Sequence, residues 1–388
     1  MMSKPSAASL AMIERFVGFD TTSHKSNLPL ILFVRDELAQ QGVPSILTFD
    51  DTGTKANLFA TLGPSDQPGF ILSGHTDTVP VDDQSWSTDP FKLVRRGERL
   101  FGRGTCDMKS FSAIALALVP EFLARGLKTP IHLALSYDEE IGCIGVRRLI
   151  ADLATRNFRP LGCIVGEPTA MGIVCAHKGR RTTRVRVRGL EAHTGVPHLG
   201  VNAIEAAAEV IAFFKQVGRR LRVEGPHDKS FETPSHATIQ TSTIKGGTTS
   251  NIVAGHCKFD VDIRYLPGQD TSILLDEGKA FVERDILPEM RSVAPEAGFT
   301  WETGADFPSF SNDEDSQIVR LAKELTGAER TSKVGFGTEA GLFQEAGIPT
   351  VVCGPGDIGQ AHKPDEFIDI AQVRLCEDFL RRLMDRLA

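Results

Sequence analysis

The first half of the chain alternates between the hydrophobic spacing of helices and that of strands. Apolar residues recur at a helical period over 10–17 and 30–38, and the alanine-rich run 111–122 predicts a buried helix. Short, mostly apolar runs, typical of strands buried on both faces, occupy 57–62, 70–73, 131–136 and 163–165. This alternation predicts an α/β fold with a mostly parallel, helix-covered sheet.

The pattern changes near residue 180, where strict alternation of apolar and charged side chains begins. Val185 and Val187 alternate with arginines, and 257–263 alternates in the same way. One face of each such strand is buried and the other is exposed, which is typical of antiparallel sheets. We therefore expect an inserted α+β domain over 180–295, between the two parts of a first domain at 1–179 and 296–388.

Length and composition restrict the class of protein. A chain of 388 residues exceeds the usual size of one core, which agrees with two domains. A formal net charge of −7 argues against nucleic acid or an anionic membrane as partner. The seven cysteines are scattered and form no Cys-x-x-Cys, as expected of reduced thiols, and no apolar run resembles a signal peptide or membrane span. We therefore expect a cytoplasmic protein.

Imidazole and carboxylate side chains follow several of the predicted strands. His75, the Glu139–Glu140 pair, Glu167 and His362 each come after an apolar run, and Asp107 precedes the alanine-rich helix. Residues just past the ends of parallel strands gather at one edge of the sheet. Two imidazoles and three carboxylates there would hold two divalent ions about 3.5–4 Å apart, with one carboxylate bridging.

One carboxylate remains for proton transfer. Because adjacent residues point in different directions, one of Glu139 and Glu140 can bind metal while the other takes a proton from water. Asp77, two residues after His75, is placed to hold the second imidazole nitrogen. Taken singly, an acidic pair is usually solvated surface and a lone histidine is often structural. The recurrence of imidazole and carboxylate residues at consecutive strand ends favours the metal site.

The segments around these residues resemble the M20 family of metallopeptidases and amidohydrolases. The resemblance runs over nearly the whole chain and rests on 73–80 (SGHTDTVP), 102–109 (GRGTCDMK), 138–140 (DEE), 166–169 (GEPT), 176–179 (AHKG), 262–264 (DIR), 338–340 (TEA) and 360–366 (QAHKPDE). The chain departs from the usual family pattern at Cys106, around His193, and over 141–145. These departures bear on substrate preference more than on the chemistry.

The resemblance implies a role for each matching residue. His75, Asp107 and Glu167 would bind one zinc ion, and Asp107, Glu140 and His362 the other. Glu139 would be the general base, Asp77 would orient His75, and His193 would stabilise the oxyanion in the partner subunit's site. Asn251, Arg264 and Thr338 would contact substrate. The fold implied is a two-zinc exopeptidase-like catalytic domain with an inserted lid and dimerisation domain, and cobalt or manganese could replace zinc.

The function expected is removal of the acetyl group from an N-acetyl amino acid, with N2-acetyl-L-ornithine as the first candidate substrate. A different N-acyl amino acid, an N-succinyl diamino acid or a dipeptide are alternatives within the same chemistry. From another class, the chain could be a catalytically silent binding protein. Such a protein would have lost the base or a ligand, whereas Glu139 and all five ligand residues are present.

Overall fold

The computed structural model describes residues 4–156, 158–231 and 234–388, which divide into two compact units. The first unit comprises residues up to Ala176, Phe310–Lys333 and Thr338–Ala388. The second comprises His177–Ser309 and Val334–Gly337. The sequence suggested 180–295 for the inserted domain, but 296–309 also groups with the second unit because a strand there pairs with its sheet.

The first unit is built on a nine-stranded mixed sheet. In sheet order its strands are β1 (Ser45–Phe49), β2 (Ala56–Leu62), β6 (Ile131–Ser136), β3 (Phe70–His75), β7 (Gly162–Val165), β15 (Thr350–Val352), β8 (Ile173–His177) and β13 (Phe310–Ser311), with β14 (Thr331–Val334) paired to β8. The four central strands β6, β3, β7 and β15 are parallel, and β1 and β2 are antiparallel additions. The predicted α/β class with a mostly parallel sheet is confirmed.

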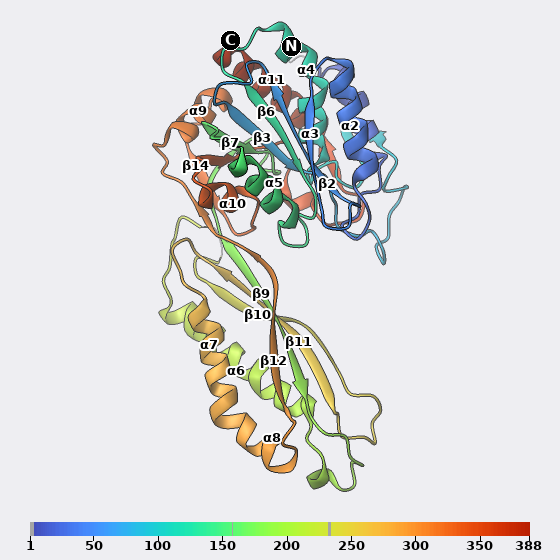
Figure 1. Cartoon of the computed structure of the whole chain (residues 1–388), viewed down its shortest axis with the longest axis vertical. Helices are drawn as coiled ribbons and strands as arrows, with labels where there is room; N and C mark the ends of the chain where they lie inside the picture. The colour runs from blue at the N-terminus through green and yellow to red at the C-terminus, as the bar shows by residue number, and fades with distance from the viewer. Residues whose placement is uncertain (1–3, 157, 232–233) are drawn as a thin grey trace. The chain divides into compact units, whose positions relative to one another are not determined.

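Burial explains why the central strands lack an alternating pattern. Every residue of β3 and β6 is buried, since helices cover the sheet (Figure 1). Their register pairs Phe70 with Ile131 and His75 with Ser136, so both strands end at the same edge. A small second sheet in this unit contains β16 (Phe367–Asp369), β5 (Arg99–Phe101) and β4 (Val94–Arg96).

The first unit has helices at each of the predicted periods, 10–17, 30–38 and 111–122, and others that were not predicted. They are α1 (Ala7–Val17), α2 (Leu28–Gln40), α3 (Lys109–Ala117), α4 (Val119–Ala124), α5 (Ile144–Thr155), α9 (Gln317–Thr326), α10 (Ala340–Glu345) and α11 (Ile370–Leu387), with a 3₁₀ turn (η3) at Ile358–Gln360. The single helix predicted over 111–122 is interrupted at Leu118. Pro120, in the first turn of α4, has no N–H to continue the hydrogen bonding of α3.

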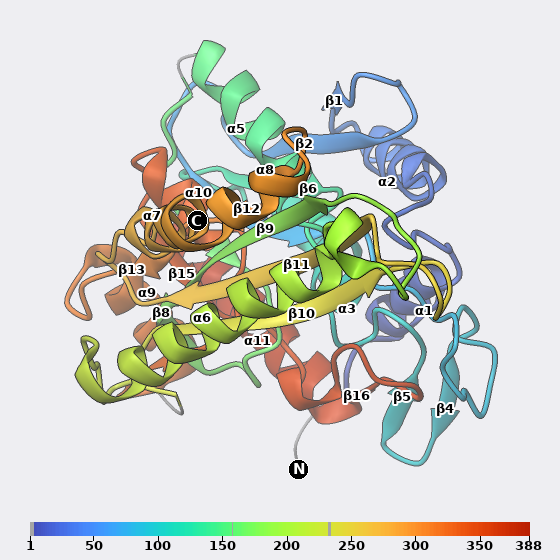
Figure 2. The same cartoon turned by 90° about the horizontal axis from the view of Figure 1, so that it is seen from below.

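The second unit is an antiparallel sheet with helices packed on it. Its strands, in sheet order, are β10 (Thr238–Gly246), β11 (His256–Tyr265), β9 (Gly179–Arg188) and β12 (Gly298–Phe307). Helix α6 (Ala203–Glu224) runs along β10 and β11 (Figure 2), and α7 (Ser272–Phe281), η2 (Val282–Ile286) and α8 (Leu287–Val293) complete the core. The 3₁₀ turn η1 (Pro197–Leu199) lies in the loop after β9. The predicted alternation is confirmed in β11, where Cys257, Phe259, Val261 and Ile263 are buried.

Two further observations concern the whole described chain. None of the helices within residues 4–156, 158–231 and 234–388 is long and apolar enough to cross a bilayer. All seven cysteines are buried and carry free thiols.

Candidate metal centre

The residues predicted to bind metal come together at the carboxyl edge of the first unit's sheet. His75 is the last residue of β3, and Glu139 and Glu140 follow β6. Glu167 follows β7, and Asp107 lies just before α3. Because parallel strands end at the same edge, the topology itself brings these side chains together.

Asp107 lies between two imidazoles. Its Oδ1 is 3.0 Å from Nε2 of His75, and its Oδ2 is 3.3 Å from Nε2 of His362. Each carboxylate oxygen therefore faces a different histidine, which is the arrangement that a carboxylate bridging two metal ions requires.

Further carboxylates complete two groups of donors. Glu140 Oε2 lies 3.0 Å from His362 Nε2, and Glu167 Oε1 lies 3.7 Å from His75 Nε2. Donor atoms of His75, Asp107 and Glu140 lie within 4.8 Å of one another, as do those of His75, Glu139 and Glu167. Imidazole nitrogens and carboxylate oxygens suit zinc, cobalt and manganese, so the donor set fits divalent metal ions.

The electrostatics of the cluster also favour bound cations. Burial, and next the charge of Asp107, raise the pKa of Glu140 to about 7. Burial likewise raises the pKa of Glu167 well above its usual value, and Asp107 adds to this effect. Hydrogen bonds to Asp107 and Glu140 raise the pKa of His362 to about 10. Several buried carboxylates close together repel one another, and divalent cations compensate that charge directly.

Asp77 organises the loop that carries Glu139 and Glu140. Its Oδ1 accepts a hydrogen bond from the backbone N–H of Glu139 (3.0 Å), and its Oδ2 from that of Glu140 (3.3 Å). Ser23 also donates to Oδ2, at 2.8 Å. The ring of His75 is held chiefly by the backbone carbonyl of Asp77, 2.9 Å from Nδ1, whereas Oδ1 of Asp77 lies 3.6 Å away.

Comparison with known proteins identifies the family of this chain. The model of peptidase family M20/M25/M40 matches residues 71–386. The chain belongs to the M20 family. It is 34% identical over 371 residues to a protein named acetylornithine deacetylase from Yersinia pseudotuberculosis, covering 94% of this chain and 92% of the relative. As an M20 protein, the chain is a metal-dependent hydrolase of amide bonds.

Solved structures show the same fold. An M20 metallo-carboxypeptidase from Sulfolobus solfataricus aligns with a TM-score of 0.77 at 17% identity, covering 97% of this chain and 99% of that one. A protein from Bacillus subtilis, described as a dinuclear metal-binding peptidase of the M20 family, aligns with a TM-score of 0.60 at 14% identity, covering 98% and 99%. At these identities the likeness concerns the fold.

The candidate substrate residues of this M20 protein are distributed over both units. Thr338 belongs to the first unit, where it is fully buried and its Oγ1 accepts a hydrogen bond from the N–H of Ala340. His193 and Asn251 are neighbours in the second unit, because the N–H of Thr194 donates to the carbonyl of Asn251. Arg264 is also in the second unit and pairs with Asp262 at 2.9 Å.

Within the second unit, His193 and Arg264 lie at opposite ends of the sheet. Arg264 pairs in register with Arg180 at one end of β9, and His256 pairs with Arg188 at the other end. The segment with His193 continues beyond that second end. The eight residue-to-residue steps from His256 to Arg264 correspond to about 26 Å of strand. These two candidates therefore cannot contact one small substrate from the same chain.

Two buried carboxylates near the site were not assigned a role from the sequence. Glu339 accepts hydrogen bonds from the hydroxyls of Ser73 and Ser136, close behind His75. Glu366 accepts several N–H groups from the loop that carries Asp107. Both lie inside segments that carry the family resemblance, but only the fold shows what they contact.

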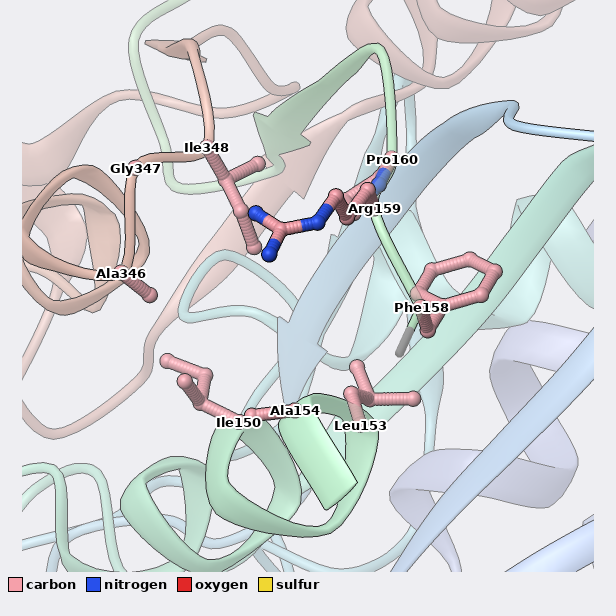
Figure 3. Close-up of a pocket in the computed structure, with 9 residues that line it drawn as sticks. All are labelled: Ile150, Leu153, Ala154, Phe158, Arg159, Pro160, Ala346, Gly347 and Ile348. Atoms are coloured by element: carbon pink, nitrogen blue, oxygen red, sulfur yellow. The ribbon is translucent and has the colours of Figure 1, made fainter. Parts of the chain in front are cut away.

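A pocket in the first unit lies away from this metal centre (Figure 3). Pro160 and Ile348, which help to line it, precede β7 and β15, whereas Glu167 follows β7. The pocket is therefore at the opposite strand ends. Most of its described lining residues are of apolar types, with Leu153 and Phe158 beside Arg159, and none of these described residues is a carboxylate or a histidine.

Proposed function

We propose that this chain is a two-zinc amidohydrolase that removes the acetyl group from an N-acetyl amino acid, with N2-acetyl-L-ornithine as substrate. The observation that carries the hydrolase is the carboxylate of Asp107 facing both His75 and His362, with Glu139 beside them. The substrate proposal rests on relatives named acetylornithine deacetylase. That activity yields L-ornithine and acetate and would serve arginine biosynthesis in the cytoplasm.

We assign the metal ligands by the contacts of the cluster. His75, Asp107 and Glu167 hold one ion, and Asp107, Glu140 and His362 hold the second. When bound, the two ions supply Lewis acidity toward the amide carbonyl and make water more acidic. Glu139 also lies within reach of His75 and Glu167, and we assign it the role of base rather than ligand.

In the reaction, Glu139 takes the proton of the attacking water and passes it to the leaving amine. Its backbone is held by Asp77, and the thiol of Cys143 lies 3.4 Å from its Oε1. These contacts orient the carboxylate before substrate arrives, which lowers the cost of reaching the reactive geometry. His193 would stabilise the negative charge that develops on the carbonyl oxygen.

Substrate contacts are proposed for three more residues. Arg264, whose guanidinium is suited to bidentate binding, would hold the α-carboxylate. Asn251 and Thr338 would complete the binding site. Because His193 and Arg264 lie at opposite ends of one sheet, both can serve one substrate only if a second copy of the chain supplies one of them, and we assign His193 and its neighbour Asn251 to that second copy. This argument supports a homodimer formed through the second unit.

A panel of substrates tests the proposal. We expect the highest kcat/KM for N2-acetyl-L-ornithine among N-acetyl amino acids, N-succinyl diamino acids and dipeptides, measured on enzyme reconstituted with zinc. A clear preference for a succinyl substrate or a dipeptide would overturn the substrate proposal while leaving the hydrolase intact. Absence of any hydrolysis by enzyme carrying two metal ions would favour a silent binding protein.

A further inference from the structure

Glu366 is a buried carboxylate that the proposed reaction does not use. It is 1% exposed and collects four N–H groups. Its Oε1 accepts hydrogen bonds from the backbone N–H groups of Cys106 (2.8 Å) and Asp107 (3.0 Å). Its Oε2 accepts from the N–H of Gly104 (3.1 Å) and from the guanidinium of Arg103 (2.8 Å). The loop that ends in Asp107 is thus wrapped around one side chain.

Arg103 extends the same network to the loop that carries His362. Its Nη1 donates to the carbonyl of Lys363 (3.3 Å), and its Nη2 donates to Oε1 of Gln84 (2.6 Å). Gln84 in turn donates through Nε2 to the carbonyl of His362, at 3.0 Å. The guanidinium also lies over the ring of Trp86, 5.0 Å from its centroid.

Apart from the contacts of its Nε2 with Asp107 and Glu140, His362 is open to solvent. Its side chain is 56% exposed, and its backbone has a φ of 63°, in the left-handed region that residues other than glycine seldom adopt. By contrast, His75 ends a buried strand and is 1% exposed. The position of His362 relative to Asp107 therefore depends on the connection between the two loops.

We propose that Glu366 is a positioning residue that fixes the loop of Asp107 against the loop of His362 and so sets the affinity of the metal position formed by Asp107, Glu140 and His362. The inference rests on the two-metal site of the proposed function. The other metal position also uses Asp107, but His75 and Glu167 are fixed by β3 and β7, so it depends less on Glu366.

The substitution Glu366→Gln tests this requirement with little change in size. A carboxylate presents two acceptor oxygens, whereas an amide presents one acceptor and an NH₂ group. Whichever way the glutamine turns, two of the four N–H groups face a donor, so the loops lose part of their connection. Disturbing residues that hold ligands in place typically costs about 10–100-fold in metal affinity.

Glu377 provides a matched control. It is also 1% exposed and accepts hydrogen bonds from a backbone N–H and a hydroxyl, both of Ser6, and from Arg381. It lies on α11, and its hydrogen bonds to described residues go to Ser6 and Arg381, not to the ligand loops. Glu377→Gln should therefore lower thermal stability without changing metal binding.

The experiment uses the full chain, stripped of metal and titrated with Co2+, with binding followed by equilibrium dialysis and by visible absorption. We expect wild type and Glu377→Gln to bind two ions per chain. Glu366→Gln should bind the first ion within a few-fold of wild type and the second about 10–100-fold more weakly. Unchanged binding of both ions, or equal weakening of both, would overturn the inference.

A milder substitution covers the case in which Glu366→Gln does not fold. Arg103→Lys keeps the positive charge beside Glu366 but cannot reach Glu366, Lys363 and Gln84 together. It should weaken the second ion selectively and by a smaller factor, and unchanged binding would overturn the inference. Failure of the proposed function is distinguishable, because wild type itself would then bind fewer than two ions or hydrolyse no amide.

Discussion

The metal centre of the first unit and the substrate candidates of the second unit are organised in opposite ways. His75, Asp107 and Glu167 are almost completely buried and lie within a few ångströms of one another. His193 and Asn251 are exposed, and the sheet separates them from Arg264. The groups proposed to bind metal therefore all lie within one unit. The proposed substrate site, by contrast, needs residues that a single copy of the second unit cannot bring together.

This difference follows from the two kinds of sheet. Parallel strands place successive carboxyl ends at one edge, so residues distant in sequence meet there. In an antiparallel sheet successive strands run in opposite directions, so their carboxyl ends lie alternately at the two ends of the sheet, and residues just past those ends are separated by the length of a strand. A parallel sheet can therefore bring the residues of one site together within a single chain. In an antiparallel sheet, residues past successive strands lie at opposite ends and face different surroundings.

Metal removal should have the largest effect, because it removes the centre around which the first unit's site is arranged. Exhaustive chelation should abolish hydrolysis, and added zinc or cobalt should restore it. The measurement is activity beside metal content before and after dialysis. Full activity with metal content near zero would contradict a metal-dependent reaction.

Replacing the proposed base should come next. Glu139→Gln keeps size and shape but cannot accept a proton, so kcat should fall by about 10²–10⁴-fold with normal metal content. Glu140→Gln is the control, because it should lose metal. If Glu139→Gln lost metal instead, the ligand and base roles of the two residues would be exchanged.

His193→Ala tests whether the second unit acts on a partner's site. Loss of one group that stabilises the oxyanion should lower kcat by about 10²–10³-fold. A mixture with Glu139→Gln sharpens the test. If His193 serves the partner, mixed dimers have one intact site, and randomly exchanged subunits should regain about a quarter of wild-type activity. No recovery, with subunit exchange verified, would place His193 in its own chain's site.

Arg264→Ala should have a smaller, substrate-dependent effect. Loss of a charge-assisted contact worth about 1.5–3 kcal/mol should lower kcat/KM roughly 10–150-fold for substrates with a free carboxylate, and much less for their amides. The pairing of Arg264 with Asp262 is also compatible with a structural role. Arg184→Ala is the matched control, since Arg184 pairs with Asp260 in the same sheet. Equal losses on acids and amides would favour the structural role.

Arg159→Ala should have the smallest effect. Arg159 lines the pocket at the strand ends opposite the metal centre (Figure 3), so kcat/KM should stay close to that of wild type, and the free energy of unfolding should change by no more than about 0.5 kcal/mol, as for surface substitutions generally. A marked fall would show that this edge of the sheet takes part in the reaction.

The sequence determined the local elements and the chemical types of the site. Continuous apolar runs indicated β3, β6 and β7, because strands buried on both faces carry apolar residues at most positions. Strict alternation indicated β9 and β11, because strands buried on one face carry apolar residues at every second position. The placing of His75, Glu139–Glu140 and Glu167 after strands was enough to predict a common edge. β12 was not predicted, since its partly exposed residues alternate poorly.

Only the tertiary structure decided how those side chains face one another. That Asp107 divides its oxygens between His75 and His362, and that Glu366 accepts N–H groups from the loop before Asp107, depends on contacts between segments far apart in the chain. The spacing of apolar residues along the chain indicates which side chains are buried, but not which distant group each of them contacts. Pairing across the sheet likewise placed His193 and Arg264 at opposite ends, because strand direction and register are set by hydrogen bonds between strands.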